Sequence, residues 1–211
     1  MNAPVALETA PAAVRLHGVG VRAGRQWLLR GLHLDIGAGE LVAVTGPARG
    51  ARTLALLAAA GRLRLTEGRL SIHGGARIGL GVVRGVNDLD HALTVADTVR
   101  ERQALVPVAA DPAEVLSVLG LDLAPRRRLS DLPPVELLLL GAGLALLDRP
   151  DLLVVDDVDE VGGRGDVDRA WSVLRDVADR GTAVLAGAHD THLLADRARS
   201  VAGASALGDL T

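Results

Sequence analysis

Residues 41–60 constrain the fold of this chain most, because they join an apolar run, a glycine-containing turn and an alanine- and leucine-rich helical pattern. The run from Leu41 to Val44 has the character of a buried strand, and a helix is expected to begin near Ala51. A strand, a loop and a helix in this order are the context in which a glycine-rich loop cradles phosphate. The helix would also direct its positive dipole end and its unpaired N–H groups at an anion.

The loop matches the phosphate-binding pattern G-x-x-x-x-G-K-[ST] only in part. Gly46 and Thr53 take the first glycine and hydroxyl positions, but Ala51 replaces the second glycine and Arg52 replaces the lysine. A Cβ at position 51 crowds phosphate, and a guanidinium differs from an ammonium in reach. An ordinary turn without a ligand stays open as the alternative. The predicted nucleotide-binding residues are Gly46, Pro47, Ala48, Arg49, Gly50, Ala51, Arg52, Thr53 and Leu54.

Composition excludes several kinds of chemistry. The chain has no lysine, so all 23 basic residues are arginine and neither a Schiff base nor a phosphate-loop lysine is available. It has no cysteine, which excludes disulfides and cysteine-ligated zinc. The net charge of −3 argues against a nucleic-acid-binding surface, and the run Arg126 to Arg128 is too short to change this. Neither a signal peptide nor a membrane-spanning run is found, so we expect a cytoplasmic protein.

The order of the expected elements favours a mostly parallel sheet flanked by helices. Residues 1–11 are rich in alanine and proline and are expected to form a disordered tail before a single domain at 12–211. Because the second half alternates strand and helix, its strands should be parallel. The first hundred residues should add an antiparallel edge layer. Strands are expected at 13–21, 27–36, 41–45, 66–74, 77–83, 152–155 and 183–186. Helices are expected to begin near 51, 94 and 112, another helix to end at 147, one to cover 167–180, and the last to begin at 189.

An acidic strand end supports the phosphate-type loop. The apolar run Leu152 to Val155 is followed by Asp156 and Asp157. A carboxylate in this place can hold a magnesium ion together with a loop hydroxyl and phosphate oxygens. Thr53 and Asp156 are therefore the predicted magnesium ligands. An aspartate that only caps a turn is the simpler alternative.

The order and spacing of these features resemble the nucleotide-binding subunit of an ATP-binding cassette (ABC) transporter over residues 14–207. The resemblance implies a P-loop NTPase-like α/β fold with a small helical subdomain at about 86–134. It implies ATP and Mg²⁺ as cofactors and a membrane-embedded transporter subunit as partner, with the chain peripheral at the inner face of the cell membrane. The chain would form a homodimer, or a heterodimer with an intact ABC subunit.

Several residues take the family's functional positions in altered form. Asp157 stands where the family has a glutamate that polarises water, and its carboxylate is withdrawn by about one methylene. His189 matches the switch histidine, and these two residues are the predicted catalytic pair. The family's Leu-Ser-Gly-Gly-Gln signature, which grips the γ-phosphate across a dimer, is represented by Leu129, Ser130 and Asp131. Both glycines are missing, and Asp131 brings a charge that repels phosphate.

Two further positions of the family lack their usual residue. No glutamine lies near residues 83–85, and no aromatic that would stack on adenine lies at Arg22 or Ala23. Trp27 is either a substitute for that aromatic or part of the core. We therefore predict an ABC-type ATPase with weakened ATP binding and hydrolysis. The alternative is a non-catalytic structural or regulatory module with the same fold that binds no nucleotide.

Overall fold

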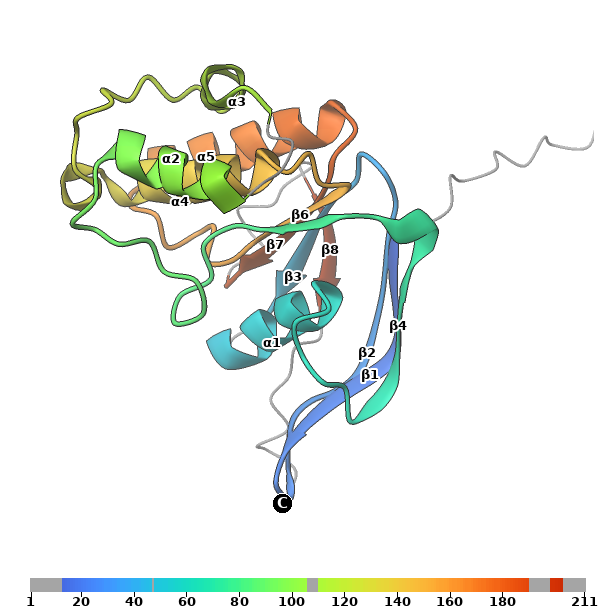
Figure 1. Ribbon diagram of the computed structural model, residues 1–211. Coiled ribbons are helices and arrows are strands. Elements are labelled where there is room, and N and C mark those ends of the chain that lie inside the picture. Colours follow the sequence, from blue (N-terminus) through green and yellow to red (C-terminus); the bar gives the residue numbers. More distant parts are fainter. Residues whose placement is uncertain (1–12, 47, 106–109, 190–197, 203–211) are drawn as a thin grey trace, which may run out of the picture.

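The computed structural model describes residues 13–46, 48–105, 110–189 and 198–202, so the expected tail and Pro47 lie outside it. Two sheets organise the chain (Figure 1): an antiparallel sheet of order β2-β1-β4 and a parallel sheet of order β5-β6-β7-β3-β8. The predicted α/β fold with an antiparallel edge layer is confirmed. The strands are β1 (Val14–Ala23), β2 (Gln26–Ile36), β3 (Leu41–Thr45), β4 (Glu67–Ile72), β5 (Ile78–Leu80), β6 (Leu152–Val155), β7 (Ala183–Ala188) and β8 (Arg199–Ala202).

The strands of the parallel sheet are apolar because both faces of the sheet are covered. β3, β6 and β7 are buried along their whole length. Their side chains alternate between two hydrophobic clusters, so that Leu41 and Ala43 join one cluster while Val42 and Val44 join the other. Successive side chains of a strand point to opposite faces, which explains why the sequence shows continuous apolar runs here.

Helices and the antiparallel sheet cover the two faces of the parallel sheet (Figure 1). α1 (Arg49–Ala59) packs between the two sheets, and α4 (Pro134–Leu146) and α5 (Arg164–Asp179) cover the opposite face. α3 (Pro112–Val118) packs on α4 and α5. α2 (Val95–Leu105) reaches α4 through Arg102, whose Nε donates to the Leu144 carbonyl over 3.1 Å. No helix within the described ranges has the length and apolar character that crossing a bilayer requires.

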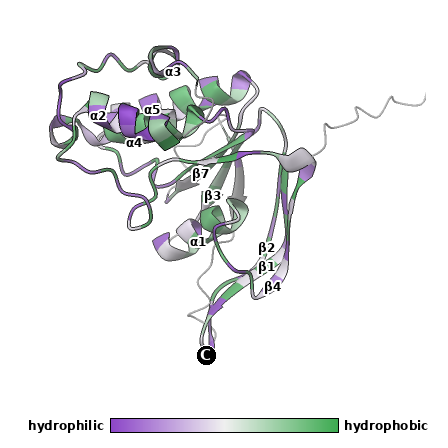
Figure 2. Cartoon of the chain, in the orientation of Figure 1, coloured by the Kyte–Doolittle hydropathy of each residue, from purple (hydrophilic) through white to green (hydrophobic). Residues whose placement is uncertain are grey.

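The antiparallel sheet shows the alternation expected from the sequence. In β1, Val14 and Leu16 are buried whereas Arg15 and His17 are exposed, and hydrophobic and hydrophilic residues alternate along β1 and β2 (Figure 2). One face of this sheet therefore packs toward α1 and the other faces solvent. Between residues 86 and 134 lie α2, α3 and the 3-10 helix η2 (Leu129–Asp131), and the boundaries of the expected helical subdomain stay a prediction.

Several expected boundaries or elements differ from the structure, among them the start of α5, which lies at Arg164 and not at 167. The strand expected to run to Gly74 ends at Ile72, because Gly74 has a φ of 63° within the 3-10 helix η1 (His73–Gly75). Of the strand expected over 77–83, only β5 (Ile78–Leu80) pairs with β6. Further along, the Val83 N–H donates to Asn87 Oδ1 over 2.8 Å. α1 begins two residues before Ala51. β8 was not expected from the sequence, and it is a strand because it pairs with β3. The helix expected from 189 lies outside the described residues beyond His189.

Gly68 tests how closely β1 and β4 approach. Its φ is 79°, and a Cβ there would lie 2.3 Å from the Gly18 carbonyl oxygen, whereas Gly18 has a φ of 58° and open space around it. We expect Gly18→Ala to lower the free energy of unfolding by about 1–2 kcal/mol through backbone strain. Gly68→Ala should lower it by about 1–3 kcal/mol more, because the two strands must also separate. Urea unfolding of both variants measures the difference, and equal losses would contradict the close approach.

Candidate functional site

Two motifs that are 103 residues apart in the chain meet at one edge of the parallel sheet. β3 ends at Thr45 and leads through the loop into α1, while β6 ends at Val155 and leads into the acidic segment. Parallel strands present their carboxyl ends at the same edge. The Thr53 hydroxyl on α1 donates to Asp156 Oδ2 over 2.6 Å. The structure thus brings together the two residues that the sequence predicts as magnesium ligands.

Asp156 is a buried carboxylate, only 3% exposed. Its Oδ1 accepts the Asp157 N–H over 2.8 Å. Gly187 in β7 leaves room for it, since a Cβ at that position would lie 2.3 Å from Asp156 Oδ1. Burial raises the pKa of Asp156 above its ordinary value, and the charge of Asp157 acts in the same direction. The hydrogen bond from Thr53 opposes this rise because it favours the ionised form.

Arg52, which stands at the lysine position of the loop pattern, folds back onto the loop. Its side chain is only 1% exposed. Nη1 donates to the Gly46 carbonyl over 2.6 Å, and Nη2 lies 3.5 Å from Asp157 Oδ1. Nε is buried and has no hydrogen-bond partner among the described residues. An unpartnered buried donor costs about 1–3 kcal/mol, so Nε marks a place where an acceptor atom would be favoured.

Asp157, predicted to orient water, is held in place by charged neighbours. Arg49 Nε donates to its Oδ1 over 3.2 Å, and Arg49 Nη2 lies 3.1 Å from its Oδ2. The same guanidinium is paired with Glu160. Asp157 has a φ of 52°, which is uncommon for a residue other than glycine. Such a backbone conformation persists only where the surrounding structure holds it. Its carboxylate is therefore engaged by two arginines.

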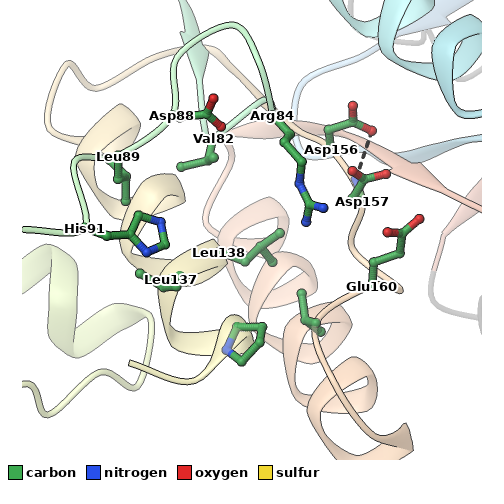
Figure 3. Close-up of a pocket in the computed structure, with 12 residues that line it drawn as sticks. Val82, Arg84, Asp88, Leu89, His91, Leu137, Leu138, Asp156, Asp157 and Glu160 are labelled. Carbon is green, nitrogen blue, oxygen red and sulfur yellow. Dashed lines mark hydrogen bonds between the residues drawn. The ribbon is translucent and has the colours of Figure 1, made fainter. Parts of the chain in front are cut away.

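A pocket of about 360 Å³ adjoins this acidic edge (Figure 3). Asp156, Asp157 and Glu160 form one side, while the loop over residues 82–91 and the start of α4 form the other. Figure 3 shows Arg84 reaching from that loop into the pocket. Near residues 83–85, where the resemblance to ABC cassettes implies a glutamine, the side-chain amide of Asn87 bonds the backbone. It accepts from the Val83 N–H and donates to the Gly81 carbonyl.

The remaining predicted residues lie around this edge rather than within it. His189 is exposed, and its N–H donates to Asp159 Oδ2 over 2.6 Å, which ties the end of β7 to the acidic segment. Leu129 is buried in η2, where the Ser130 N–H donates to the His91 carbonyl over 3.1 Å. Within the described part of the chain, no hydrogen bond or ion pair joins Leu129, Ser130 or Asp131 to the loop at 46–54.

Trp27 is neither fully buried nor open. The guanidinium carbons of Arg22 and Arg30 each lie 4.6 Å from the centre of its ring system. Cations over an aromatic face are held by its negative electrostatic potential. An adenine base could therefore stack on Trp27 only after an arginine had moved.

Sequence reasoning missed Asp159 and Glu160, which bind the end of β7 and Arg49 respectively. The signal was present as an acidic run, because four of the five residues from Asp156 to Glu160 are carboxylic acids. Distances in the fold were needed to distinguish their partners.

Comparison with known proteins agrees with the geometry, although no family model matches the chain. The zinc import ATP-binding protein ZnuC of Cereibacter sphaeroides is 29% identical over 185 residues, which cover 86% of this chain and 74% of that protein. The Fe(3+) ions import ATP-binding protein FbpC of Streptomyces coelicolor is 31% identical over 203 residues, covering 89% of this chain and 58% of that protein. The chain is similar in sequence to the ATP-binding subunits of ABC import transporters and similar in fold to ABC cassettes.

Solved structures of ABC cassettes share the fold. The dimeric structure of MJ0796, a bacterial ABC transporter cassette, has a TM-score of 0.74 at 18% identity and covers 90% of this chain and 94% of its own. A post-hydrolysis state of the same cassette holds ADP and Pi. The ADP conformation of the cassette MJ1267 gives a TM-score of 0.74 at 15% identity, covering 91% of this chain and 87% of its own. The predicted resemblance to ABC cassettes is confirmed at the level of the fold.

The raised pKa of Asp156 gives the stability of the fold a defined pH dependence. A carboxyl group whose pKa is raised on folding contributes stability below its unfolded value of about 3.8, and this contribution is lost as the pH rises through the folded pKa. The free energy of unfolding of the wild type minus that of Asp156→Asn should therefore fall as the pH rises. Urea unfolding of both proteins from pH 3.5 to 7 measures this difference, and a constant or rising value would refute the assignment.

Proposed function

We propose that the chain is the ATP-binding subunit of an ABC import transporter and that it works at the cytoplasmic face of the membrane. The 2.6 Å contact of the Thr53 hydroxyl with the Asp156 carboxylate carries the proposal, because it lies where the phosphate-type loop has entered α1. Oxygen ligands in this place suit a magnesium ion that also binds phosphate oxygens. The import functions named for its zinc and iron relatives support the transporter class.

The side chains at the edge fit magnesium and a nucleoside triphosphate. The described residues hold no cluster of three or more histidine or carboxylate side chains arranged for a metal. Thr53 and Asp156 would share a magnesium ion with phosphate oxygens and water, because magnesium in proteins commonly keeps few protein ligands. When bound, the ion neutralises phosphate charge. Gly46 and residues 48–54 would surround the phosphates, with the unpartnered Nε of Arg52 directed to the β- and γ-phosphates.

Turnover is proposed to be slow because the groups for the chemical step are altered or engaged. Asp157 would orient the attacking water and His189 would contact that water and the γ-phosphate. The shorter side chain of Asp157 is tied to Arg49 and Arg52, so it must be released before it can position water. Ala51 is buried in the first turn of α1, where its Cβ limits the approach of phosphate.

The proposed partner is a membrane-embedded transporter subunit. The loop over 82–91 lines the pocket beside the acidic edge and includes residues 83–85, near which the resemblance to ABC cassettes implies the position that senses that partner. A second cassette is also proposed, because the signature of one subunit would grip the γ-phosphate at the loop of the other, and the altered Ser130 and Asp131 of a second copy would do so only weakly. The chain would pair with a cassette that keeps its own signature or with itself, and no role for nucleic acid is proposed. The lack of nucleotide-dependent dimers with any such cassette would oppose this pairing.

One observation favours the alternative, a module with the ABC fold that binds no nucleotide. Arg52 already donates to Gly46 and contacts Asp157, so the chain's own groups satisfy most of the charge at the loop. The change in melting temperature caused by Mg-ATP decides between the two functions.

We expect Mg-ATP at ten times its dissociation constant to raise the melting temperature by about 3–6 °C, since a ligand that binds only the folded chain stabilises it by about 1.4 kcal/mol. Asp156→Asn should lose the dependence on magnesium. Asp35→Asn, which removes an exposed carboxylate paired with Arg15 on the antiparallel sheet, is the control and should keep it. A wild type that shows no shift at any ATP concentration would support the non-binding module.

A further inference from the structure

Arg49 and Arg52 leave α1 in its first turn, and both contact the carboxylate of Asp157. Arg49 makes the stronger contact, with its Nε and Nη2 each within about 3.2 Å of a different Asp157 oxygen. Two parallel contacts of this kind fit the planar fork of a guanidinium. Arg49 is paired with Glu160 as well, so one guanidinium holds two carboxylates from the segment after β6.

The charges of this cluster leave no surplus for a bound anion. The two guanidinium groups contact the carboxylates of Asp157 and Glu160. A phosphate group that approached the start of α1 would meet arginines already neutralised by the protein. Guanidinium forks bind carboxylate and phosphate with the same bidentate geometry, so the two anions compete for one set of donors.

The carboxylates have space into which they can withdraw. Asp157 and Glu160 both line the pocket of about 360 Å³, and Figure 3 shows their carboxylates at its rim. The side chain of Glu160 is 40% exposed and that of Arg49 is 42% exposed, so this pair can separate without opening the core. Asp157 is only 10% exposed and its backbone is fixed, which makes Glu160 the member that moves most easily.

We propose that Asp157 and Glu160 form a carboxylate latch on Arg49 and that this latch controls access of a polyphosphate ligand to the loop. The inference rests on the phosphate-binding role proposed above. In the latched state, Arg49 joins α1 to the acidic segment. Polyphosphate takes the guanidinium of Arg49 from Glu160 first and then from Asp157. Release of Asp157 in the same exchange frees the carboxylate that would orient water, so ligand binding and activation of the site are coupled.

The test measures binding of inorganic tripolyphosphate by calorimetry, without magnesium and at constant pH and ionic strength. Glu160→Gln should bind tripolyphosphate about tenfold more tightly than the wild type, because Arg49 loses one competing charged partner. Arg49→Ala should bind it about tenfold more weakly. Glu67→Gln is the matched control, since Glu67 has a similar exposure of 38% and is also paired with an exposed arginine, Arg30, but lies on β4.

A double variant separates the latch from a general effect of removing negative charge. In the Arg49→Ala background, the latch predicts that Glu160→Gln leaves the affinity unchanged, whereas a general field effect would still raise it. Persistence of the gain in that background would overturn the latch. An unchanged affinity of Glu160→Gln, with tripolyphosphate and ATP still bound by the wild type, would overturn the latch and leave the proposed function standing.

The remaining outcomes also decide the question. Binding of tripolyphosphate by Glu160→Gln but not by the wild type would support a latch that holds the empty site shut. Absence of binding by every variant, with native melting transitions, would overturn the latch, and the proposed function would fall with it only where Mg-ATP also leaves the melting temperature of the wild type unchanged. Melting curves establish whether each variant is folded. We expect all of them to fold, because only exposed or half-exposed side chains are changed.

Discussion

Parallel pairing of β3, β7 and β6 is the constraint on which the rest of this structure depends. β7 lies between the other two strands, so the carboxyl ends of β3 and β6 reach the same edge of the sheet although they are distant in the chain. Both faces of the sheet are buried, which keeps polar side chains out of the strands themselves. Ionisable groups can therefore gather only where the strands end, and Thr53 meets Asp156 there.

The changes that the sequence shows at this edge are coupled in space. Arg52 in the loop and Asp157 after β6 look like independent departures from the ABC pattern, yet their side chains lie 3.5 Å apart. A broad guanidinium at position 52 can reach both the Gly46 carbonyl and that carboxylate, whereas a compact ammonium offers no such fork. Arg49 and Glu160 extend the same network to the rim of the pocket. The edge is thus a charge-balanced cluster whose electrostatics differ from those of an open phosphate loop.

Fold and chemistry carry different information about this protein. The MJ0796 and MJ1267 cassettes each have a TM-score of 0.74 with less than a fifth of their residues identical, so the arrangement of strands and helices is retained while side chains vary. Activity depends on those side chains and on their positions to within an ångström. The likeness to ABC cassettes therefore concerns the fold, and the contacts of Arg49, Arg52 and Asp157 determine the electrostatics at the carboxyl edge of the sheet.

The sequence by itself determined the elements and their class, because apolar runs, alternation and helix caps are local signals. Strands β3, β6 and β7 and the antiparallel layer follow from such patterns, and so does the prediction that Thr53 and Asp156 share one edge. Tertiary structure alone decided the rest. β8 is a strand because it pairs with the edge of β3. Arg52 can be buried because it donates to the Gly46 carbonyl and lies beside the Asp157 carboxylate. Trp27 lies under two arginines that only the hairpin brings together. Long-range pairing and charge neutralisation depend on distances in space, which spacing along a chain does not record.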